Sequence, residues 1–469
     1  MKKTFFLIVF VILIINIFFT RLALSLTIAE EEELGKEFIV LVNKYFDIVK
    51  DPFIVNYINT TGNKIVSAFP PQPFIFKFYV IKEPSYNAFA GPAAHVFINS
   101  GLFESMDNED ELAGILSHEI AHVVCRHISQ KISQSNKIQI GTIAAVVASI
   151  FLGAGGAGTA AQALSIGSIA TGQSIALAYS REDETQADQI GCKYLLKAGY
   201  SGKGLVSILK KIKNQEWFGP DQIPTYLTTH PGLSERLTYI SSWVDINDVK
   251  DTQSSPKVNS YDFDLTHTKI SALYNDENIA LKKFEKAVAQ KPDDAMTNYG
   301  YGLVLSRFGE RKEAANRIKK ALGKNAFDKC ILKDLGKVYY LDGKYKEALS
   351  ILEVSVSPDD YDGLFVIARI NMELGNYAEA IPIFERIIAH EKDYHQAIYY
   401  LGESYGKINN FEDAHFYLGK YYTEINNIPN ALFHLEKSLK LTSDPEKKEK
   451  IKELIKQNKK KIKPQIDNR

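Results

Sequence analysis

The chain has 469 residues, a length that corresponds to about three domains. It contains 56 Lys and Arg residues and 56 Asp and Glu residues, so its formal net charge at pH 7 is zero. This balance excludes the strongly basic class of proteins that bind nucleic acid through electrostatics. We therefore expect polypeptide partners and no nucleic acid.

The N-terminus has the pattern of an export signal. Lys2 and Lys3 precede an apolar run over residues 5–19, and small residues follow at Ala23 and Ser25. This order is typical of a secretory signal peptide, so we expect residues 1–26 to be cleaved. An uncleaved membrane anchor is the alternative, because the apolar stretch is nearly long enough to span a bilayer.

The run over residues 95–102 alternates as an edge strand does. An exposed strand edge can pair backbone to backbone with an extended peptide, which predicts a substrate-binding strand. An ordinary strand inside a sheet is the alternative.

An HExxH motif follows at His118, Glu119 and His122, within residues 109–130, where apolar positions recur with helical spacing. Helix positions four apart share a face, so both imidazoles can bind one zinc ion while Glu119 serves as the base that activates water. His127 would lie about 140° around the same helix from His122. That position indicates either a surface residue or a neighbour of a ligand.

A catalytic zinc site needs a third protein ligand. The metzincin continuation is absent, because Cys125 and Ile128 stand where that pattern requires Gly and His. The start of a second helix, at residues 180–188, supplies Glu184 and Asp188, which share a face at a spacing of four residues. The apolar residues that follow favour an inward-facing surface, whereas an exposed acidic helix start is the alternative.

The motif HEIAHVVCRH, followed by SREDETQAD at residues 180–188 and THPGLSER at residues 229–236, resembles the gluzincin family of Ste-type and HtpX-type metallopeptidases. The likeness covers nearly the whole chain and points to the periplasmic, TPR-bearing, BepA-like branch. It implies one zinc ion per chain, bound by His118, His122 and Glu184, with Glu119 as the general base.

The resemblance also implies roles for two further residues. Asp188 either orients a ligand imidazole or donates a proton, and the orienting role is physically the safer. His230 matches a histidine that approaches the metal in the BepA-like branch, as a fourth ligand or latch. A loop histidine before Pro231 is the alternative.

The stretch between the two motifs leaves alternatives open. Residues 138–177 carry no charge and are rich in Ala, Gly, Ile and Ser. This composition predicts two mobile helices packed over the site, with a lid or peripheral membrane contact as a further hypothesis.

The chain has three cysteines, so at least one is unpaired if the chain enters an oxidising compartment. Cys125 and Cys192 lie on the two predicted motif helices and either form a disulfide or only pack there. The pairing of Cys330, in the predicted array, is also left open.

A helical repeat begins after a polar linker at residues 251–260. Small residues recur every 32 to 34 positions, with a second series twelve positions later: Gly302, Gly336, Ala368 and Gly402, then Ala314, Ala348, Ala380 and Ala414. This period is typical of tetratricopeptide repeats. The sequence therefore predicts an α+β, mainly α protein: a gluzincin-type domain with a small sheet over residues 27–250, and an all-α array with a Lys-rich capping helix over residues 261–463.

Together, the residues and the resemblance predict a periplasmic zinc endopeptidase that hydrolyses misfolded or unassembled envelope proteins. Tyrosines on the concave side of the array would recruit these clients, and the resemblance adds the outer-membrane protein assembly machinery as a partner. One alternative is an assembly chaperone or adaptor whose metal site is latched. Another is a protease anchored to the inner membrane by an uncleaved N-terminal segment. A third, a protease embedded in the membrane, is disfavoured because no clear spanning segment follows residue 26.

Overall fold

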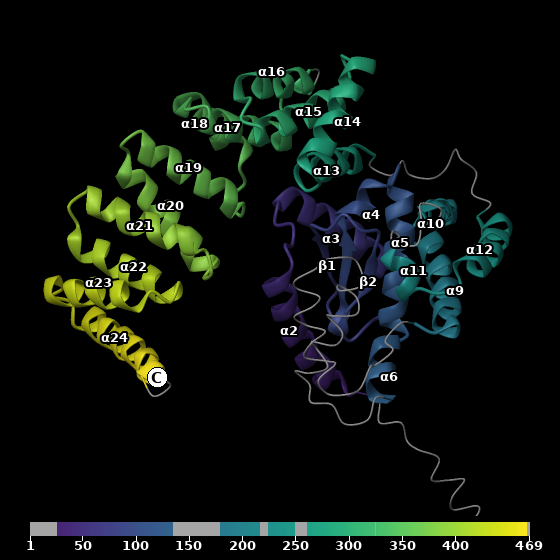
Figure 1. Ribbon diagram of the computed structural model, residues 1–469, viewed down its shortest axis with the longest axis horizontal. Helices are drawn as coiled ribbons and strands as arrows, with labels where there is room; N and C mark the ends of the chain where they lie inside the picture. The colour runs from purple at the N-terminus through teal and green to yellow at the C-terminus, as the bar shows by residue number, and fades with distance from the viewer. Residues whose placement is uncertain (1–25, 135–178, 216–223, 249–259, 324, 467–469) are drawn as a thin grey trace, which may run out of the picture. The chain divides into compact units, whose positions relative to one another are not determined.

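The computed structural model describes residues 26–134, 179–215, 224–248, 260–323 and 325–466 (Figure 1). Contacts divide the chain into two compact units, Met1–Asp276 and Glu277–Arg469. No helix within the described ranges is both long and apolar enough to cross a bilayer. Residues 1–25 of the predicted signal and the uncharged stretch at 138–177 lie outside the described residues.

The first unit is built around a three-stranded sheet with the order β1-β3-β2. Strand β1 (Lys77–Ile81) runs parallel to β3 (His95–Asn99), and β2 (Ala88–Ala90) runs antiparallel to it. One face packs on helix α2 (Ile28–Tyr45) through Phe97 and Phe89. The other face belongs to the main core, which includes residues of α3 (Pro52–Val66) and α5 (Glu109–Val124).

Of the two alternatives for residues 95–102, the edge strand is not observed and the ordinary strand inside a sheet is, over residues 95–99. Strand β3 lies in the centre of the sheet, and all five of its residues are buried. Successive side chains of β3 alternate between two apolar cores and not between a core and solvent. Val96 and Ile98 face the main core, and Phe97 faces the core under α2. The short strand β2 forms the edge nearest the helix that bears the HExxH motif, as Figure 1 shows.

Helix α5 begins where the sequence indicates and ends earlier than predicted. The Asn108 side chain caps it by accepting a 3.1 Å hydrogen bond from the Glu111 backbone N–H. The predicted helix over residues 109–130 is interrupted because Arg126 has a left-handed backbone, with φ of 55°. A second helix then begins at His127. The remaining elements of the unit are η1 (Pro92–Ala94), α4 (Ser100–Glu104), α6 (His127–Gln134), α9 (Arg181–Lys197), α10 (Gly202–Gln215), α11 (Thr225–Thr229), α12 (Leu233–Asn247) and α13 (Ser260–Leu273).

Helix α13 belongs by its contacts to the first unit. The buried Lys269 ammonium group lies 2.9 Å from the Asp51 carboxylate, and Phe263 lies in the main core. His267 Nε2 is 2.8 Å from the Glu104 carbonyl oxygen. The division by contacts therefore falls at Asp276, after α13, and the limits drawn from the sequence at residues 250 and 261 stay predictions.

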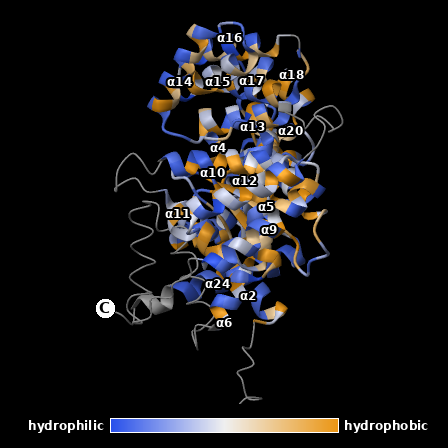
Figure 2. Ribbon diagram, turned by 90° about the vertical axis from the view of Figure 1, so that its right-hand side faces the viewer, coloured by the Kyte–Doolittle hydropathy of each residue, from blue (hydrophilic) through white to orange (hydrophobic). Residues whose placement is uncertain are grey.

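The second unit consists of helices that pack against their neighbours in sequence. Figure 2 shows hydrophilic and hydrophobic residues mixed along these helices, as expected of an amphipathic array. The small residues lie where helices approach closely: a Cβ added at Gly336 would lie 2.6 Å from Leu352 Cγ. The predicted fold class is confirmed. The helices are α14 (Glu277–Gln290), α15 (Ala295–Arg307), α16 (Arg311–Leu322), α17 (Lys329–Leu341), α18 (Tyr345–Ser355), α19 (Tyr361–Glu373), α20 (Tyr377–His390), α21 (His395–Lys407), α22 (Phe411–Glu424), α23 (Ile428–Leu441) and α24 (Pro445–Ile466).

The three cysteines are free thiols. Of the alternatives left open by the sequence, packing therefore describes Cys125 and Cys192, and Cys330 is buried in the array. Burial raises the pKa of the Cys192 thiol to about 12 and that of Cys125 to about 11. Both stay protonated at neutral pH, which makes them poor nucleophiles.

Candidate active site

Helix α5 supplies the two histidines and the glutamate of the HExxH motif. His118 and His122 leave the same face of the helix, and their Nε2 atoms are 3.0 Å apart. Both rings and the Glu119 carboxylate are buried. The spacing thus brings two imidazole nitrogens to one point beside a carboxylate.

Helix α9 lies beside α5 and adds a second carboxylate (Figures 1 and 2). The two helices approach closely at Gly191, whose carbonyl oxygen accepts a 2.8 Å hydrogen bond from the Ser117 hydroxyl. A Cβ at Gly191 would lie 3.2 Å from the Ser117 carbonyl oxygen, so a larger residue would push the helices apart. This approach places Glu184 Oε1 3.4 Å from His122 Nε2 and Glu184 Oε2 3.5 Å from His118 Nε2.

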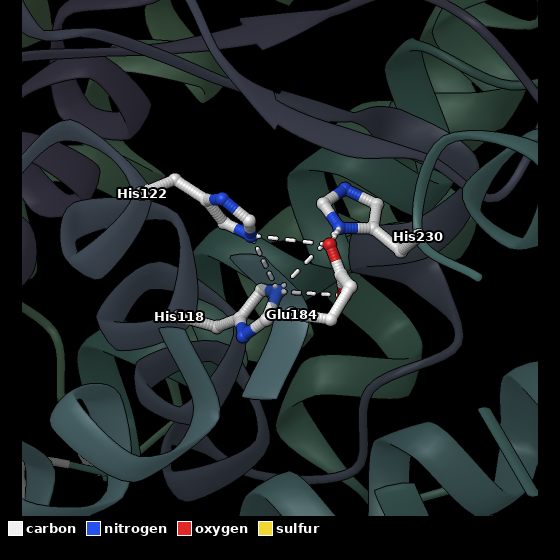
Figure 3. Close-up of side chains that lie close together, drawn as sticks. All are labelled: His118, His122, Glu184 and His230. Carbon is white, nitrogen blue, oxygen red and sulfur yellow. Dashed lines mark hydrogen bonds and ion pairs between the residues drawn. The ribbon is translucent and has the colours of Figure 1, made fainter. Parts of the chain in front are cut away.

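A third histidine, His230, enters the cluster from the end of α11 (Figure 3). Its backbone N–H donates to the Tyr226 carbonyl oxygen at 2.8 Å, and the Tyr226 ring stacks on its imidazole with centroids 4.2 Å apart. His230 Nδ1 lies 3.0 Å from Glu184 Oε1 and 3.4 Å from His118 Nε2. One donor atom from each of the four residues therefore lies within 4.8 Å of the others.

The distances between these donor atoms suit one small metal ion. Atoms bound at about 2.0 to 2.1 Å around a tetrahedral zinc ion lie about 3.3 to 3.4 Å from one another. The five distances given above between cluster atoms run from 3.0 to 3.5 Å. The donor set, imidazole with carboxylate, is also one that zinc accepts.

Two of the three expected ligands, His122 and Glu184, have the protonation state that metal binding requires. Burial lowers the pKa of His122 well below its ordinary value, so this ring is neutral at pH 7. Burial alone would raise the pKa of Glu184, but the charges of His230 and Arg236 hold it well below the usual range. Metal binding requires deprotonated ligands, and both groups are in that state. Burial and the charge of Arg236 would lower the pKa of His118, but hydrogen bonds with Asp188 and Glu184 raise it to about 9, so a metal bound there would displace a proton.

Glu119 lies in the cluster without a hydrogen-bond partner. Among the described residues, both of its buried oxygens lack one, and Oε1 is 3.6 Å from His230 Nε2. Burial raises the pKa of this carboxyl above its usual value. Because a buried polar group without a partner costs stability, this arrangement indicates a group retained to act on a ligand.

Asp188 lies behind His118, at the ring nitrogen that faces away from the cluster. Its Oδ1 is 3.0 Å from His118 Nδ1, and Arg236 on α12 donates to both of its oxygens at 2.8 Å. The Tyr239 hydroxyl also donates to Oδ2. Burial alone would raise the pKa of Asp188, but Arg236 and the hydrogen bond with His118 lower it below its ordinary value. This fixed, ionised carboxylate is placed to orient the His118 ring.

Two buried residues of the site were missed by the sequence reasoning. Arg236 forms an ion pair with Glu184 as well as with Asp188, so one guanidinium neutralises two carboxylates. Tyr179 stacks on His122 with ring centroids 3.7 Å apart. A charged residue among the buried apolar positions of α12, Leu233, Leu237 and Ile240, is a signal that points to Arg236.

His127 lies closer to the cluster than a continuous helix would allow. Its ring is buried, and its Nδ1 is 2.9 Å from His122 Nδ1. Of the two alternatives left by the sequence, a neighbour of a ligand describes it and a surface residue does not. The break between α5, which ends at Val124, and α6, which begins at His127, explains why the ring does not lie where a continuous helix would place it.

Two histidines from one helix, a carboxylate from a second helix and an unpaired glutamate beside them define the metallopeptidase class. Residues 57–244 match the sequence profile of peptidase family M48, and residues 365–425 match a tetratricopeptide-repeat profile. The chain is thus a metallopeptidase that is similar to family M48 over residues 57–244 and carries a tetratricopeptide-repeat array, as its motifs predicted. Such repeats are modules for protein–protein interaction.

Known relatives extend the likeness beyond the peptidase domain. The beta-barrel assembly-enhancing protease of Escherichia coli K12 is 24% identical over 402 residues, which cover 82% of this chain and 79% of that protein. Its namesake from Yersinia pestis is 27% identical over 69% of this chain, and the match spans only 64% of that protein. The mitochondrial metalloendopeptidase OMA1 of Schizosaccharomyces pombe is 26% identical over 41% of this chain and 54% of its own. Among solved structures, MamA matches 32% of this chain and 90% of its own at 17% identity and a TM-score of 0.30, too weak a likeness to support an inference.

Proposed function

We propose that the protein is a zinc-dependent endopeptidase whose metal is held by His118, His122 and Glu184. The observation that carries this proposal is the buried cluster in which these donors lie 3.0 to 3.5 Å apart, inside a domain of family M48. When bound, zinc would polarise the carbonyl of the scissile peptide bond and lower the pKa of a water molecule. Hydrolysis of peptide bonds is the reaction that this donor set supports best.

Glu119 acts as the general base in this proposal. Its carboxylate is buried beside the cluster, lacks a hydrogen-bond partner within the described residues, and has a pKa raised by burial. A raised pKa brings a carboxyl closer to the neutral range in which proton transfer is efficient. Glu119 would take the proton from the attacking water and return it to the departing amine.

Asp188 acts as an orienting residue and His230 as a latch. The Asp188 carboxylate lies 3.0 Å from His118 Nδ1, where it would hold the ring with Nε2 toward the metal position. His230 adds a fourth donor to the cluster. A zinc ion with four protein ligands has no position left for water, so His230 has to move before a substrate is cut.

The repeat array recruits clients in this proposal. Helices α19, α20 and α21 border an open pocket of about 390 Å³ lined by Arg369, Met372, Glu373, Tyr377, Tyr399, Tyr400, Glu403 and Lys407. Tyrosine rings and charged side chains of both signs supply contacts for an extended polypeptide. The relatives named beta-barrel assembly-enhancing proteases support misfolded or unassembled envelope proteins as clients and outer-membrane assembly machinery as a partner. The signal-like pattern of residues 1–26 supports a periplasmic location, with anchoring to the inner membrane as the alternative.

An assembly chaperone or adaptor with a latched site is the second candidate. It is favoured by the position of His230, which adds a fourth protein donor to the cluster. It leaves Glu119 unexplained, because a protein that only binds its clients does not need a buried base.

Three variants test the proposed enzyme. Glu119→Gln should retain zinc and lose casein hydrolysis by about a hundredfold or more, because the base is not a ligand. Glu184→Ala should lose both, whereas Glu182→Ala, on the exposed face of α9, should change neither. Zinc content measured by atomic absorption, beside the rate of casein cleavage, gives both readouts. Undiminished cleavage by Glu119→Gln would overturn the assigned base, and a parent chain that binds no zinc would overturn the enzyme.

A further inference from the structure

The buried ring of His127 connects the ligand His122 to helix α9. His127 Nδ1 lies 2.9 Å from His122 Nδ1, and its Nε2 lies 2.9 Å from the side-chain oxygen of Gln186. The Asp183 carboxylate is farther away, at 3.8 Å from the same Nε2. His127 therefore has one polar partner at each ring nitrogen, and one of these partners is a residue of the metal cluster.

The break between α5 and α6 places this ring. Arg126 adopts a left-handed backbone, with φ of 55°, which is unfavourable for a residue other than glycine. Its guanidinium donates to Glu31 on α2 at 2.7 and 3.2 Å and to the Leu26 carbonyl oxygen at 2.6 Å. These contacts hold the turn, and the turn brings His127 back toward His122.

The direction of each hydrogen bond follows from the metal site. His122 Nε2 faces the cluster, and a ring nitrogen that binds a metal carries no proton. The proton of a neutral His122 ring is then on Nδ1, which donates to His127 Nδ1. The proton of His127 is therefore on Nε2, which donates to Gln186 Oε1. In this scheme each of the two neutral rings has one nitrogen that carries a proton and donates it, and one that has a free lone pair, for the metal in His122 and for the hydrogen bond from His122 in His127.

The two ligand histidines are thus oriented by different means. His118 Nδ1 lies 3.0 Å from the ionised carboxylate of Asp188, the kind of neighbour that ligand histidines commonly have. His122 lies beside a neutral imidazole in the corresponding position. We propose that His127 is a positioning residue that fixes the ring and the tautomer of His122 for metal binding. This inference rests on the proposed metal site.

Substitution at His127 tests the inference through metal affinity. His127→Leu removes the acceptor and keeps an apolar side chain in the pocket, so the dissociation constant for zinc should rise about 10- to 100-fold in a chelator competition. His127→Asn places a side-chain oxygen near the position of Nδ1 and should recover most of the affinity. His267→Leu, in α13 and outside the cluster, is the control for a general loss of packing and should leave zinc affinity unchanged.

Cobalt provides a second readout that a loss of packing would not reproduce. The absorption bands of the Co²⁺-substituted chain should shift in His127→Leu and return toward the parent spectrum in His127→Asn, because they report the geometry of the ligands. Unchanged zinc affinity and an unchanged cobalt spectrum in His127→Leu, with a parent chain that binds one metal ion, would overturn the positioning role alone. A parent chain that binds neither metal would instead overturn the proposed function.

Gln186 allows the same test from an exposed position on α9. Gln186→Glu retains an acceptor for His127 Nε2 and should preserve zinc affinity. Gln186→Lys has only donors, so it favours the opposite tautomer of His127, which cannot accept from His122. Zinc affinity should fall severalfold in Gln186→Lys, and equal affinity in the two variants would contradict the proposed chain of hydrogen bonds.

Discussion

Arg236 is a buried cation that pairs with two carboxylates of the site. Its guanidinium pairs with Glu184 and with Asp188, and all three side chains are buried. The charges of the two carboxylates in turn hold the pKa of Arg236 well above its ordinary value, although burial opposes this shift. The acidic side of the metal cluster therefore depends on this one cation.

Replacing Arg236 by Met should lower the free energy of unfolding of the metal-free first unit by about 3 to 5 kcal/mol, because two buried carboxylates lose their cation. Arg181→Met breaks the exposed pair with Glu235 and should cost at most about 1 kcal/mol. The only tryptophans, Trp217 and Trp243, belong to the first unit, so their fluorescence during urea unfolding isolates it. Equal losses in the two variants would show that Arg236 is not what stabilises the carboxylates.

At the scale of elements, the short helix α11 carries at its end His230, the fourth donor residue of the cluster. Two backbone hydrogen bonds tie this helix to the unit, one near its start from Tyr226 N–H to the Tyr86 carbonyl oxygen and one at its end from Tyr179 N–H to the Thr229 carbonyl oxygen. His230 Nε2 is also 3.3 Å from the Ala88 carbonyl oxygen on the edge strand β2. His230 thus lies between the metal cluster and the edge of the sheet.

His230→Ala should raise the basal rate of peptide hydrolysis if the histidine is a latch. A latch worth about 1.4 kcal/mol keeps about nine tenths of the molecules closed, so its removal should raise the rate about tenfold at little cost in zinc. Thr228→Ala, an exposed position on the same helix, should leave the rate unchanged. A lower turnover with zinc still bound would indicate instead that His230 stabilises charge in the transition state.

The helices of the array depend on small residues at their closest approach. A Cβ at Gly336 would meet Leu352 Cγ at 2.6 Å, so Gly336→Ala should destabilise the second unit by about 1 to 3 kcal/mol. Gly406, also in a helix, has room for a Cβ 3.7 Å from Ala414 Cβ, and Gly406→Ala should be neutral or stabilising by up to about 1 kcal/mol. Urea unfolding followed by far-UV circular dichroism measures both. The reverse order of stabilities would show that the helices can move apart.

At the scale of the whole molecule, the two units should separate the chemistry from the capture of clients. The first unit has its own apolar core, which includes Phe263 of α13. A fragment of residues 26–276 should therefore cleave a short peptide as fast as the full chain and cleave casein about tenfold more slowly or worse, because the array no longer raises the local concentration of the client.

The matched fragment of residues 26–250 lacks α13. It exposes the surface that Phe263 covers and leaves Asp51 without the Lys269 ammonium group, so it should unfold at lower urea concentration than residues 26–276. Kinetics on both substrates and tryptophan fluorescence provide the measurements. Equal casein cleavage by residues 26–276 and the full chain would remove the recruiting role of the array.

Sequence alone determined the parts of this protein that depend on local spacing. The HExxH motif sets His118 and His122 on one helix face, because residues four apart always share a face. The period of small residues in the array likewise predicts helix pairs, since each pair repeats the same close contact. The resemblance to known metallopeptidases added Glu184, Asp188 and His230, which spacing alone left open or did not reach.

Tertiary structure decided everything that depends on contacts distant in sequence. Strand β3 alternates like an edge strand but lies in the centre, because two separate apolar cores cover its faces. His127 turns back toward His122 because Glu31, far away in the chain, holds the left-handed turn at Arg126. Arg236 joins the cluster because α12 brings it against α9. The free energies that fix these positions come from burial and ion pairs between distant segments, and local spacing carries no information about them.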